Sequence, residues 1–265
     1  MNLELGSPIA YGATAEIYAW EEGQILKLFF DWFGRENIEY EARMARAVYA
    51  SGLPVPAVGE MVVVNGRIGL IYERVAGKSL FEVMPSKPWT IFRYARRMAE
   101  MHVEMHANPL EPEIPRQRER LVRKIKAAKA LPDALRVRVL ATLAKMPDGN
   151  QICHGDFHPG NVMASPQSEI IIDWIDATRG NPLADLARSS IIALGAAASS
   201  QTPKRTDKMF VRLFHRLYLR HYFSLRSEGR GEYGRWLPIV AAARLSENIP
   251  ELEQWLLAQA EKAVD

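Results

Sequence analysis

The residues best suited to chemistry lie in one octet, His-Gly-Asp-Phe-His-Pro-Gly-Asn, at positions 154–161. Transfer of a phosphoryl group requires an acceptor that orients the attacking hydroxyl, oxygen ligands for Mg²⁺ and a cation on the phosphates. Asp156 and Asn161 supply an acceptor and an amide ligand, and Pro159-Gly160 favours the sharp turn needed between them. The octet therefore predicts a loop suited to phosphoryl transfer.

Three alternating side chains of the octet, His154, Asp156 and His158, also have the spacing with which a strand binds a metal ion. That pattern would suit a metal-dependent hydrolase, which needs further ligands. His102 and His106 lie four apart on a predicted helix, but the glutamate between them has the wrong offset for H-E-x-x-H. We keep the hydrolase as the less favoured alternative and expect a helical histidine of this pair to be packed in the core.

A second carboxylate, Asp173, follows the short apolar run at 170–172. A residue that emerges at the end of a buried strand is free to bind a metal ion. Mg²⁺ favours few carboxylates together with water and phosphate oxygens, so Asp173 and the amide of Asn161 suffice as protein ligands.

The cation that holds the phosphates is expected early in the chain. Lys27 is the one basic residue of the predicted strand at 24–30, and it lies between two leucines. Because side chains alternate along a strand, Lys27 points to the face opposite those leucines. It is our candidate for the phosphate-binding cation.

A buried lysine needs a carboxylate partner, and the predicted helix at 35–51 offers Glu36, Glu39 and Glu41. Glu41 borders the apolar stripe of this helix, whereas Glu39 aligns with arginines on the charged face. We therefore select Glu41.

The wider pattern changes character near residue 75. Before it, the sequence predicts a helix and a small antiparallel sheet whose last hairpin turns at Asn65-Gly66, with strands at 3–10, 15–20 and 24–30. After it, the periodicity predicts helices at 88–107, 116–130, 133–146, 183–198, 206–226, 233–245 and 249–263. We expect an α+β protein with a β-rich domain at 1–75 and a larger, mainly helical domain at 76–265.

The octet, with Ile-Ile-Asp-Trp at 171–174 and Gly-Asn-Pro-Leu-Ala-Asp-Leu-Ala-Arg at 180–188, resembles the aminoglycoside phosphotransferase and choline kinase family. Members of that family are relatives of protein kinases that phosphorylate small molecules, so the resemblance implies a bilobal, protein-kinase-like fold with a nucleotide-binding first lobe. It implies that Asp156 is the catalytic base or orients the hydroxyl, and that Asn161 and Asp173 bind Mg²⁺. It also implies that Lys27, paired with Glu41, contacts the α- and β-phosphates, and that His154 supports the loop from behind.

The resemblance extends to the nucleotide, which we expect to be ATP, with GTP not excluded. Gly12 and Thr14 lie where backbone amides and a hydroxyl would contact phosphates, although one glycine stands where protein kinases carry three. By position, Glu73 and Val75 resemble the connector that offers a carbonyl and an amide to adenine.

Composition narrows the setting and the partners. A single cysteine, Cys153, and a start without a basic and apolar leader predict a cytoplasmic protein. The most apolar stretch is far shorter than the roughly 20 residues of a membrane span. In the basic segment at 204–235 no interleaving of aromatic and basic residues resembles a single-strand binding surface, so we expect an exposed helix face and no nucleic-acid partner. The oligomeric state stays open.

The acceptor is expected to be a small-molecule alcohol, because the predicted helix start at Pro182 follows Asp173 by only nine positions, too few for a peptide-holding segment. Residues 76–265 carry 28 basic and 21 acidic side chains, which disfavours a polycationic aminoglycoside without excluding one. Sugars, amino alcohols and hydroxy acids stay open, with acidic or aromatic pocket candidates at Asp176, Glu247, Glu251, Tyr233, Trp236 and Trp255.

Two further points concern carboxylates and turnover. Asp185 follows Asn181-Pro182 in the first turn of a predicted helix, and we interpret it as a structural residue that stabilises the helix end. The role of Asp176 stays undecided.

A nucleotide-binding regulatory pseudokinase is the alternative function of a different class, although every catalytic position is filled.

Overall fold

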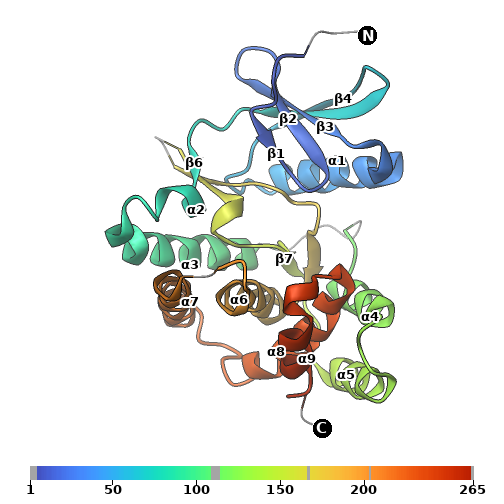
Figure 1. Ribbon diagram of the computed structural model, residues 1–265, viewed down its shortest axis with the longest axis vertical. Helices are drawn as coiled ribbons and strands as arrows, with labels where there is room; N and C mark the ends of the chain where they lie inside the picture. The colour runs from blue at the N-terminus through green and yellow to red at the C-terminus, as the bar shows by residue number, and fades with distance from the viewer. Residues whose placement is uncertain (1–4, 109–113, 166–167, 203, 264–265) are drawn as a thin grey trace. The chain divides into compact units, whose positions relative to one another are not determined.

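The computed structural model describes residues 5–108, 114–165, 168–202 and 204–263. Within these ranges the chain forms two compact units (Figure 1). The first comprises Met1–Val83 and Gly160–Ile175, and the second comprises Met84–Pro159 and Asp176–Asp265. The octet is thus divided between the units after Pro159. These units do not test the domain boundary at residue 75, which stays a prediction.

The first unit is built on a five-stranded antiparallel sheet with the order β1-β2-β3-β5-β4. Its strands are β1 (Ala10–Tyr11), β2 (Ala15–Ala19), β3 (Gln24–Phe29), β4 (Val58–Val64) and β5 (Arg67–Glu73). The predicted strand at 3–10 is wrong over its described part before Ala10. Pro8 has no amide to donate to a ladder, and Ile9 N, which donates to Ile17 O at 2.8 Å, makes the first cross-strand bond.

Alternation along the strands gives the sheet two apolar faces. Leu26 and Leu28 lie on one face with Val64, whereas Phe29 lies on the other face with Leu70. The helix α1 (Arg35–Ala50) covers the second face and buries Ile38 and Ala42 there (Figure 1). Full burial of each large apolar side chain contributes about 1.5–3 kcal/mol, which fixes α1 on the face to which Lys27 also points.

The later part of the first unit, Gly160–Ile175, contributes to a second sheet. It has the order β6-β8-β9 and is formed by β6 (Lys78–Ser79), β8 (Val162–Ala164) and β9 (Glu169–Ile171). A short helix, α2 (Leu80–Val83), follows β6, and a 3₁₀ turn, η3 (Pro159–Asn161), precedes β8. Ile172 N donates to Asn161 O at 3.0 Å, which ties the start of β8 to the residue before Asp173.

The second unit is mainly helical. Its longer helices are α3 (Ile91–Ala107), α4 (Gln117–Ala127), α5 (Asp133–Lys145), α6 (Pro182–Ala198), α7 (Arg205–Leu225), α8 (Tyr233–Arg244) and α9 (Glu253–Ala260). Short 3₁₀ turns are η1 (Asp31–Phe33) in the first unit and η2 (Pro88–Thr90), η4 (Leu245–Glu247) and η5 (Pro250–Leu252) in the second. The helix predicted at 249–263 therefore begins as a 3₁₀ turn at Pro250.

Helix α6 is the centre of the second unit. It lies between α7 and α8 and contacts both (Figure 1). It is buried on nearly all sides, and Asn181 caps it by accepting from Leu183 N at 2.9 Å. A two-stranded antiparallel pair, β7 (Gln151–Cys153) with β10 (Thr178–Gly180), delivers the chain to the octet and takes it back toward α6.

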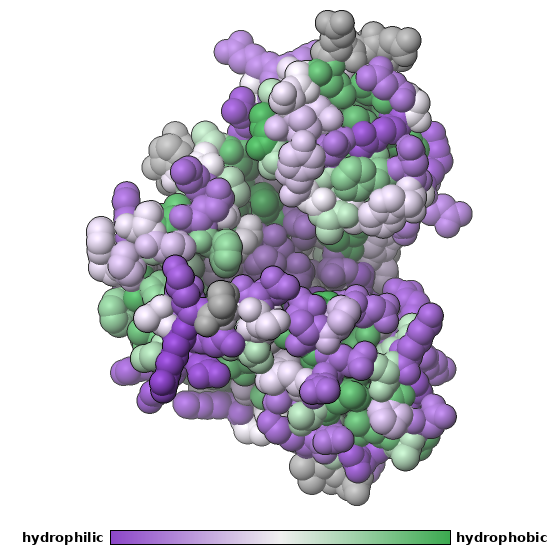
Figure 2. Space-filling view, in the orientation of Figure 1, coloured by the Kyte–Doolittle hydropathy of each residue, from purple (hydrophilic) through white to green (hydrophobic). Residues whose placement is uncertain are grey.

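The expected fold class is confirmed: a small antiparallel sheet with one long helix forms the first unit, and helices dominate the second. On the face seen in Figure 2, hydrophilic side chains are interspersed among hydrophobic ones. Among the described residues, no helix combines the length and the hydrophobicity needed to cross a membrane. The arginines of the basic segment at 212, 216 and 220 are exposed on α7, as predicted.

The turn at Asn65-Gly66 gives a first prediction. Gly66 has φ +81°, a conformation that costs an alanine about 1–2 kcal/mol, so Gly66→Ala should lower the free energy of unfolding of the first unit by that amount. The same change at Gly234, inside α8 with open space around it, should instead raise stability by about 0.5–1 kcal/mol. Urea unfolding followed by circular dichroism measures both, and equal effects would contradict the turn geometry.

Candidate active site

The first unit brings three of the predicted residues into contact. Lys27 Nζ lies 2.6 Å from Glu41 Oε1 and 3.4 Å from Asp173 Oδ1. Glu41 is 2% exposed and also accepts from the Tyr72 hydroxyl at 3.0 Å. Burial lowers the pKa of Lys27, but the carboxylates of Asp173 and Glu41 outweigh it and hold the pKa above its ordinary value. The lysine is therefore a fixed cation.

Asp173 has features of a metal ligand. Its side chain is 43% exposed, and its backbone has φ +64°, which is uncommon for a residue other than glycine and often marks a functional position. Asn161 is buried, and its carbonyl accepts from the residue before Asp173. One carboxylate and one amide are hard oxygen donors, so this pair fits a Mg²⁺ ion that takes its other ligands from phosphates and water.

The residues expected to contact the nucleotide are also in the first unit. Gly12 N donates to Ala15 O at 2.8 Å, so this amide is used inside its own turn, and Thr14 O accepts from Phe30 N at 3.0 Å. Glu73 ends β5 and holds Ala57 N through its carboxylate at 3.0 Å. The Val75 amide makes no hydrogen bond with any residue in the described ranges.

In the second unit, a buried carboxylate holds the start of the octet. Asp185 Oδ2 accepts from His154 N at 2.7 Å, and Oδ1 accepts from Gly155 N at 2.8 Å. Asp185 is therefore structural, but for a reason the sequence did not reveal. Its own helix is capped by Asn181, and the carboxylate instead holds the loop 30 residues earlier in the chain.

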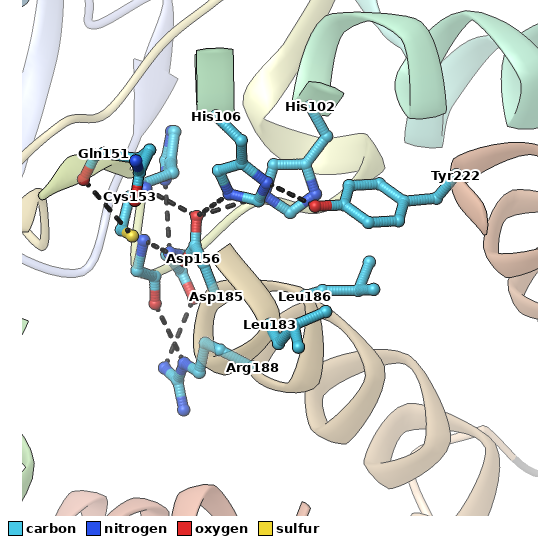
Figure 3. A network of polar contacts seen from close by, with 12 residues as sticks. His102, His106, Gln151, Cys153, Asp156, Leu183, Asp185, Leu186, Arg188 and Tyr222 are labelled. Carbon is cyan, nitrogen blue, oxygen red and sulfur yellow. Dashed lines mark hydrogen bonds and ion pairs between the residues drawn. The ribbon is translucent and has the colours of Figure 1, made fainter. Parts of the chain in front are cut away.

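Two histidines of α3 complete the surroundings of this carboxylate. His102 Nε2 and His106 Nε2 lie 3.1 and 3.3 Å from Asp185 Oδ2, and both rings point toward it in Figure 3. On their other side, Nδ1 of His102 bonds to the Tyr218 hydroxyl, and Nδ1 of His106 bonds to the Tyr222 hydroxyl. Both histidines are buried, although we expected this of only one.

The hydrogen-bond pattern fixes the protonation of this cluster. Burial is the main reason that the pKa of His106 falls to about 3, so the ring is neutral at pH 7. Burial raises the pKa of Asp185, but hydrogen bonds from His102 and His106 outweigh it and hold the pKa well below its ordinary value. Because each Nε2 lies against the carboxylate and each Nδ1 lies against a tyrosine hydroxyl, all four ring nitrogens already have protein partners.

The geometry of the loop itself then follows. Gly155 has φ +80°, and a Cβ there would clash with the backbone of Asp176, so this position requires glycine. His154 is fully buried, and its Nδ1 accepts from Asp156 N at 3.2 Å. The His154 ring thus fixes the backbone amide of Asp156, while the Asp156 side chain stays 32% exposed.

Two basic side chains face the Asp156 carboxylate. His158 Nε2 lies 3.4 Å from Oδ2. Arg188 Nη2 lies 3.3 Å from Oδ1 (Figure 3). Burial raises the pKa of Asp156, but the hydrogen bond from His158 and the charge of Arg188 outweigh it and hold the pKa far below its ordinary value. The alternating His154, Asp156 and His158 therefore do not converge on one point, as a metal site would require.

Sequence reasoning missed Arg188 and its surroundings. Arg188 follows Asp185 by one helical turn of α6, donates to Gly155 O at 2.9 Å and also contacts Glu247. The one available signal was the spacing of three residues, which places Arg188 on the same face as Asp185. Of the aromatic candidates, Trp236 is buried and Tyr233 donates to the Ser190 hydroxyl at 2.6 Å, so both serve packing.

Comparisons with known proteins bear on the family and the fold. The family model described as "Phosphotransferase enzyme family" matches residues 7–226. No curated protein sequence matches the chain.

Solved structures show the same protein-kinase-like fold. A thermostable mutant of aminoglycoside phosphotransferase APH(4)-Ia, in a ternary complex with AMP-PNP and hygromycin B, has a TM-score of 0.67 at 14% identity, with 98% of this chain and 92% of that chain covered. Amicoumacin kinase hAmiN, solved with AMP-PNP, Ca²⁺ and Ami, has a TM-score of 0.64 at 16% identity, with 97% and 86% covered. A choline/ethanolamine kinase family protein from Mesorhizobium loti has a TM-score of 0.60 at 17% identity, with 97% and 87% covered.

The hold of Asp185 on the loop can be measured. Asp185→Ala leaves two backbone amides and two histidine donors without their acceptor in a buried place, so the free energy of unfolding should fall by about 3 kcal/mol or more. Asp133→Ala, at a 99% exposed position in the first turn of α5, is the matched control and should change it by less than about 0.5 kcal/mol. Equal losses in urea unfolding would show that Asp185 does not hold the loop.

Proposed function

Because the chain belongs to the phosphotransferase enzyme family, we propose that it is an ATP-dependent kinase that transfers the γ-phosphate to a hydroxyl of a small molecule, such as a sugar, an amino alcohol or an aminoglycoside. The observation that carries the proposal is the Lys27 ammonium, placed between the buried Glu41 and the exposed Asp173. A cation so placed, beside an exposed carboxylate, suits the binding of a phosphoryl donor together with its counter-ion.

In this proposal the first unit holds the nucleotide. Lys27, kept in position by Glu41, contacts the α- and β-phosphates, and the turn at Gly12 and Thr14 lies against them. Because the Gly12 amide is already bonded to Ala15 O, the Thr14 hydroxyl is the better candidate for a phosphate contact. The Glu73 carbonyl and the Val75 amide would contact adenine, and the open Val75 amide supports this. Either ATP or GTP offers such a ring edge.

Asn161 and Asp173 would hold Mg²⁺, which neutralises charge on the phosphates when it is bound. Asp173 also contacts Lys27, so the metal-binding carboxylate and the phosphate-binding ammonium fix one another's position. Nucleotide-analogue complexes of two structural relatives, one of which contains Ca²⁺, support a nucleotide together with a divalent cation.

Asp156 would receive the acceptor hydroxyl. Because the pKa of its carboxyl lies far below the ordinary value, Asp156 is ionised at pH 7 and is a weak base toward an alcohol. We therefore propose that it orients the hydroxyl by accepting its hydrogen bond, and takes the proton only as the bond to phosphorus forms. The network from Asp185 through His154 and Gly155 supports this role, because it fixes the backbone on which Asp156 depends.

A small acceptor fits the chain better than a peptide does. Between Asp173 and the start of α6 at Pro182 lie eight residues, three of which form β10. No segment of this stretch is long enough to hold a peptide in the way that protein kinases do. We also propose that the protein acts in the cytoplasm, where ATP and small alcohols are available and a lone, buried cysteine stays reduced.

The role of Asp156 can be tested by Asp156→Asn. This change keeps the shape of the side chain but removes the anionic acceptor, so kcat for phosphate transfer should fall by roughly 10²- to 10⁴-fold, with the Kd for Mg-ATP unchanged. A coupled assay for ADP release and calorimetric titration with a non-hydrolysable ATP analogue give the two quantities. Asp133→Asn, at an exposed site, is the control and should match wild type. Full activity of Asp156→Asn would refute the mechanism.

A further inference from the structure

A small cavity in the second unit lies beside Asp156 and is unusually rich in charge. Its volume is about 50 Å³, room for more than one water molecule and so for one compact polar group. The charged side chains that line it come from α4, α6, α8 and η4, namely Arg120, Lys124, Arg188, Arg244 and Glu247, together with Asp176 and Asp185.

Three cations in this cavity share one carboxylate. Glu247 Oε1 lies 3.1 Å from Lys124 Nζ and 2.8 Å from Arg188 Nη2, and Oε2 lies 3.3 Å from Arg244 Nε. The side chains of Lys124 and Glu247 are 26% and 24% exposed, so this group can be reached from solvent. Asp156 also contacts Arg188, so two negative charges among three positive charges leave a local excess of one.

The charges of the cluster shift one another's pKa values. Burial lowers the pKa of Lys124, and the nearby Arg188 charge lowers it further. Burial also raises the pKa of Glu247, but Arg188, Lys124 and Arg244 outweigh it and hold that pKa below its ordinary value. Arg244 Nε is buried, and Glu247 Oε2, 3.3 Å away, lies outside hydrogen-bond geometry. The cluster thus carries a net positive charge and a weakly bonded donor.

The acidic residues of the cavity, in contrast, are already paired. Asp176 forms an ion pair with Arg120, Glu247 is surrounded by the three cations, and Asp185 is buried under the histidines. A polycationic acceptor would have to displace a guanidinium or an ammonium to reach any of them. An anion needs only to join a group that is short of negative charge.

We propose that the acceptor carries an anionic group, a carboxylate or a phosphate, which binds among Lys124, Arg188 and Arg244 while its hydroxyl lies at Asp156. The inference rests on the proposed function and narrows its substrate class. Arg188 links the two positions, because its Nη2 lies 3.3 Å from Asp156 Oδ1 and 2.8 Å from Glu247 Oε1. The hydroxyl and the anionic group therefore belong to one compact molecule, a hydroxy acid or a phosphorylated alcohol.

Four alcohols with the same three-carbon skeleton test this charge preference: glycerate, glycerol 3-phosphate, glycerol and 2-amino-1,3-propanediol. Their phosphorylation by Mg-ATP is measured by ADP release, and their binding is measured by calorimetry. At least one of the two anionic alcohols should bind and react with kcat/KM roughly tenfold or more above the neutral and cationic ones, and the better of the two identifies carboxylate or phosphate as the group.

Variants locate the effect in the cavity. Lys124→Met should weaken binding of the anionic alcohol by roughly tenfold or more, whereas Lys126→Met, which removes an exposed lysine of the same helix, should not. Glu247→Gln removes the competing carboxylate and should strengthen anion binding, whereas it would weaken binding of a cation. If Glu247→Gln does not fold, the comparison of anion binding between Lys124→Met and Lys126→Met still tests whether the anion binds in the cavity.

The outcomes separate this inference from the proposed function. Phosphorylation of glycerol or 2-amino-1,3-propanediol at least as fast as of the anions, unaffected by Lys124→Met, would overturn the inference and leave the kinase intact. Binding of an anionic alcohol that depends on Lys124, with no phosphate transfer to it, would support the anion site and refute the kinase. No detectable binding of either anion to the wild-type protein would overturn the inference.

Discussion

The buried carboxylate of Asp185 is the interaction on which the rest of the second unit depends. A carboxylate that is only 1% exposed costs free energy unless its lone pairs find donors, and here two backbone amides and two histidines supply them. The donors come from α3 and from the end of β7, while the carboxylate comes from α6. These three elements are therefore fixed together, and the loop that carries Asp156 takes its shape from them.

Local patterns in the sequence predicted the first unit well. Lys27 follows from alternation along one strand, and Glu41 follows from the edge of an apolar stripe on one helix, so each could be inferred from its own segment. Asp185 was interpreted as a helix-end residue because its partners lie 30 and about 80 residues away. No periodicity within α6 reports a hydrogen bond to a loop in another part of the chain.

The charge count after residue 75 did not locate the basic residues that line the cavity. The excess of basic residues after residue 75 is partly an exposed face of α7. The charged cluster of the cavity is instead assembled from four elements. Helices α4, α6 and α8 each contribute one cation, and η4 contributes Glu247, which contacts all three. Likewise Asp176, which sequence reasoning left undecided, is neutralised by Arg120. Pairing between distant segments, which composition cannot report, decides the character of the cavity.

The central chemical claim is that this chain joins the γ-phosphate of ATP to an alcohol oxygen. Phosphorus NMR of the wild-type protein with Mg-ATP and a mixture of small alcohols, hydroxy acids and phosphorylated alcohols tests it directly. The account predicts a new phosphate-monoester resonance that grows in step with ADP. Consumption of ATP that yields only ADP and inorganic phosphate, or no consumption at all, would contradict it.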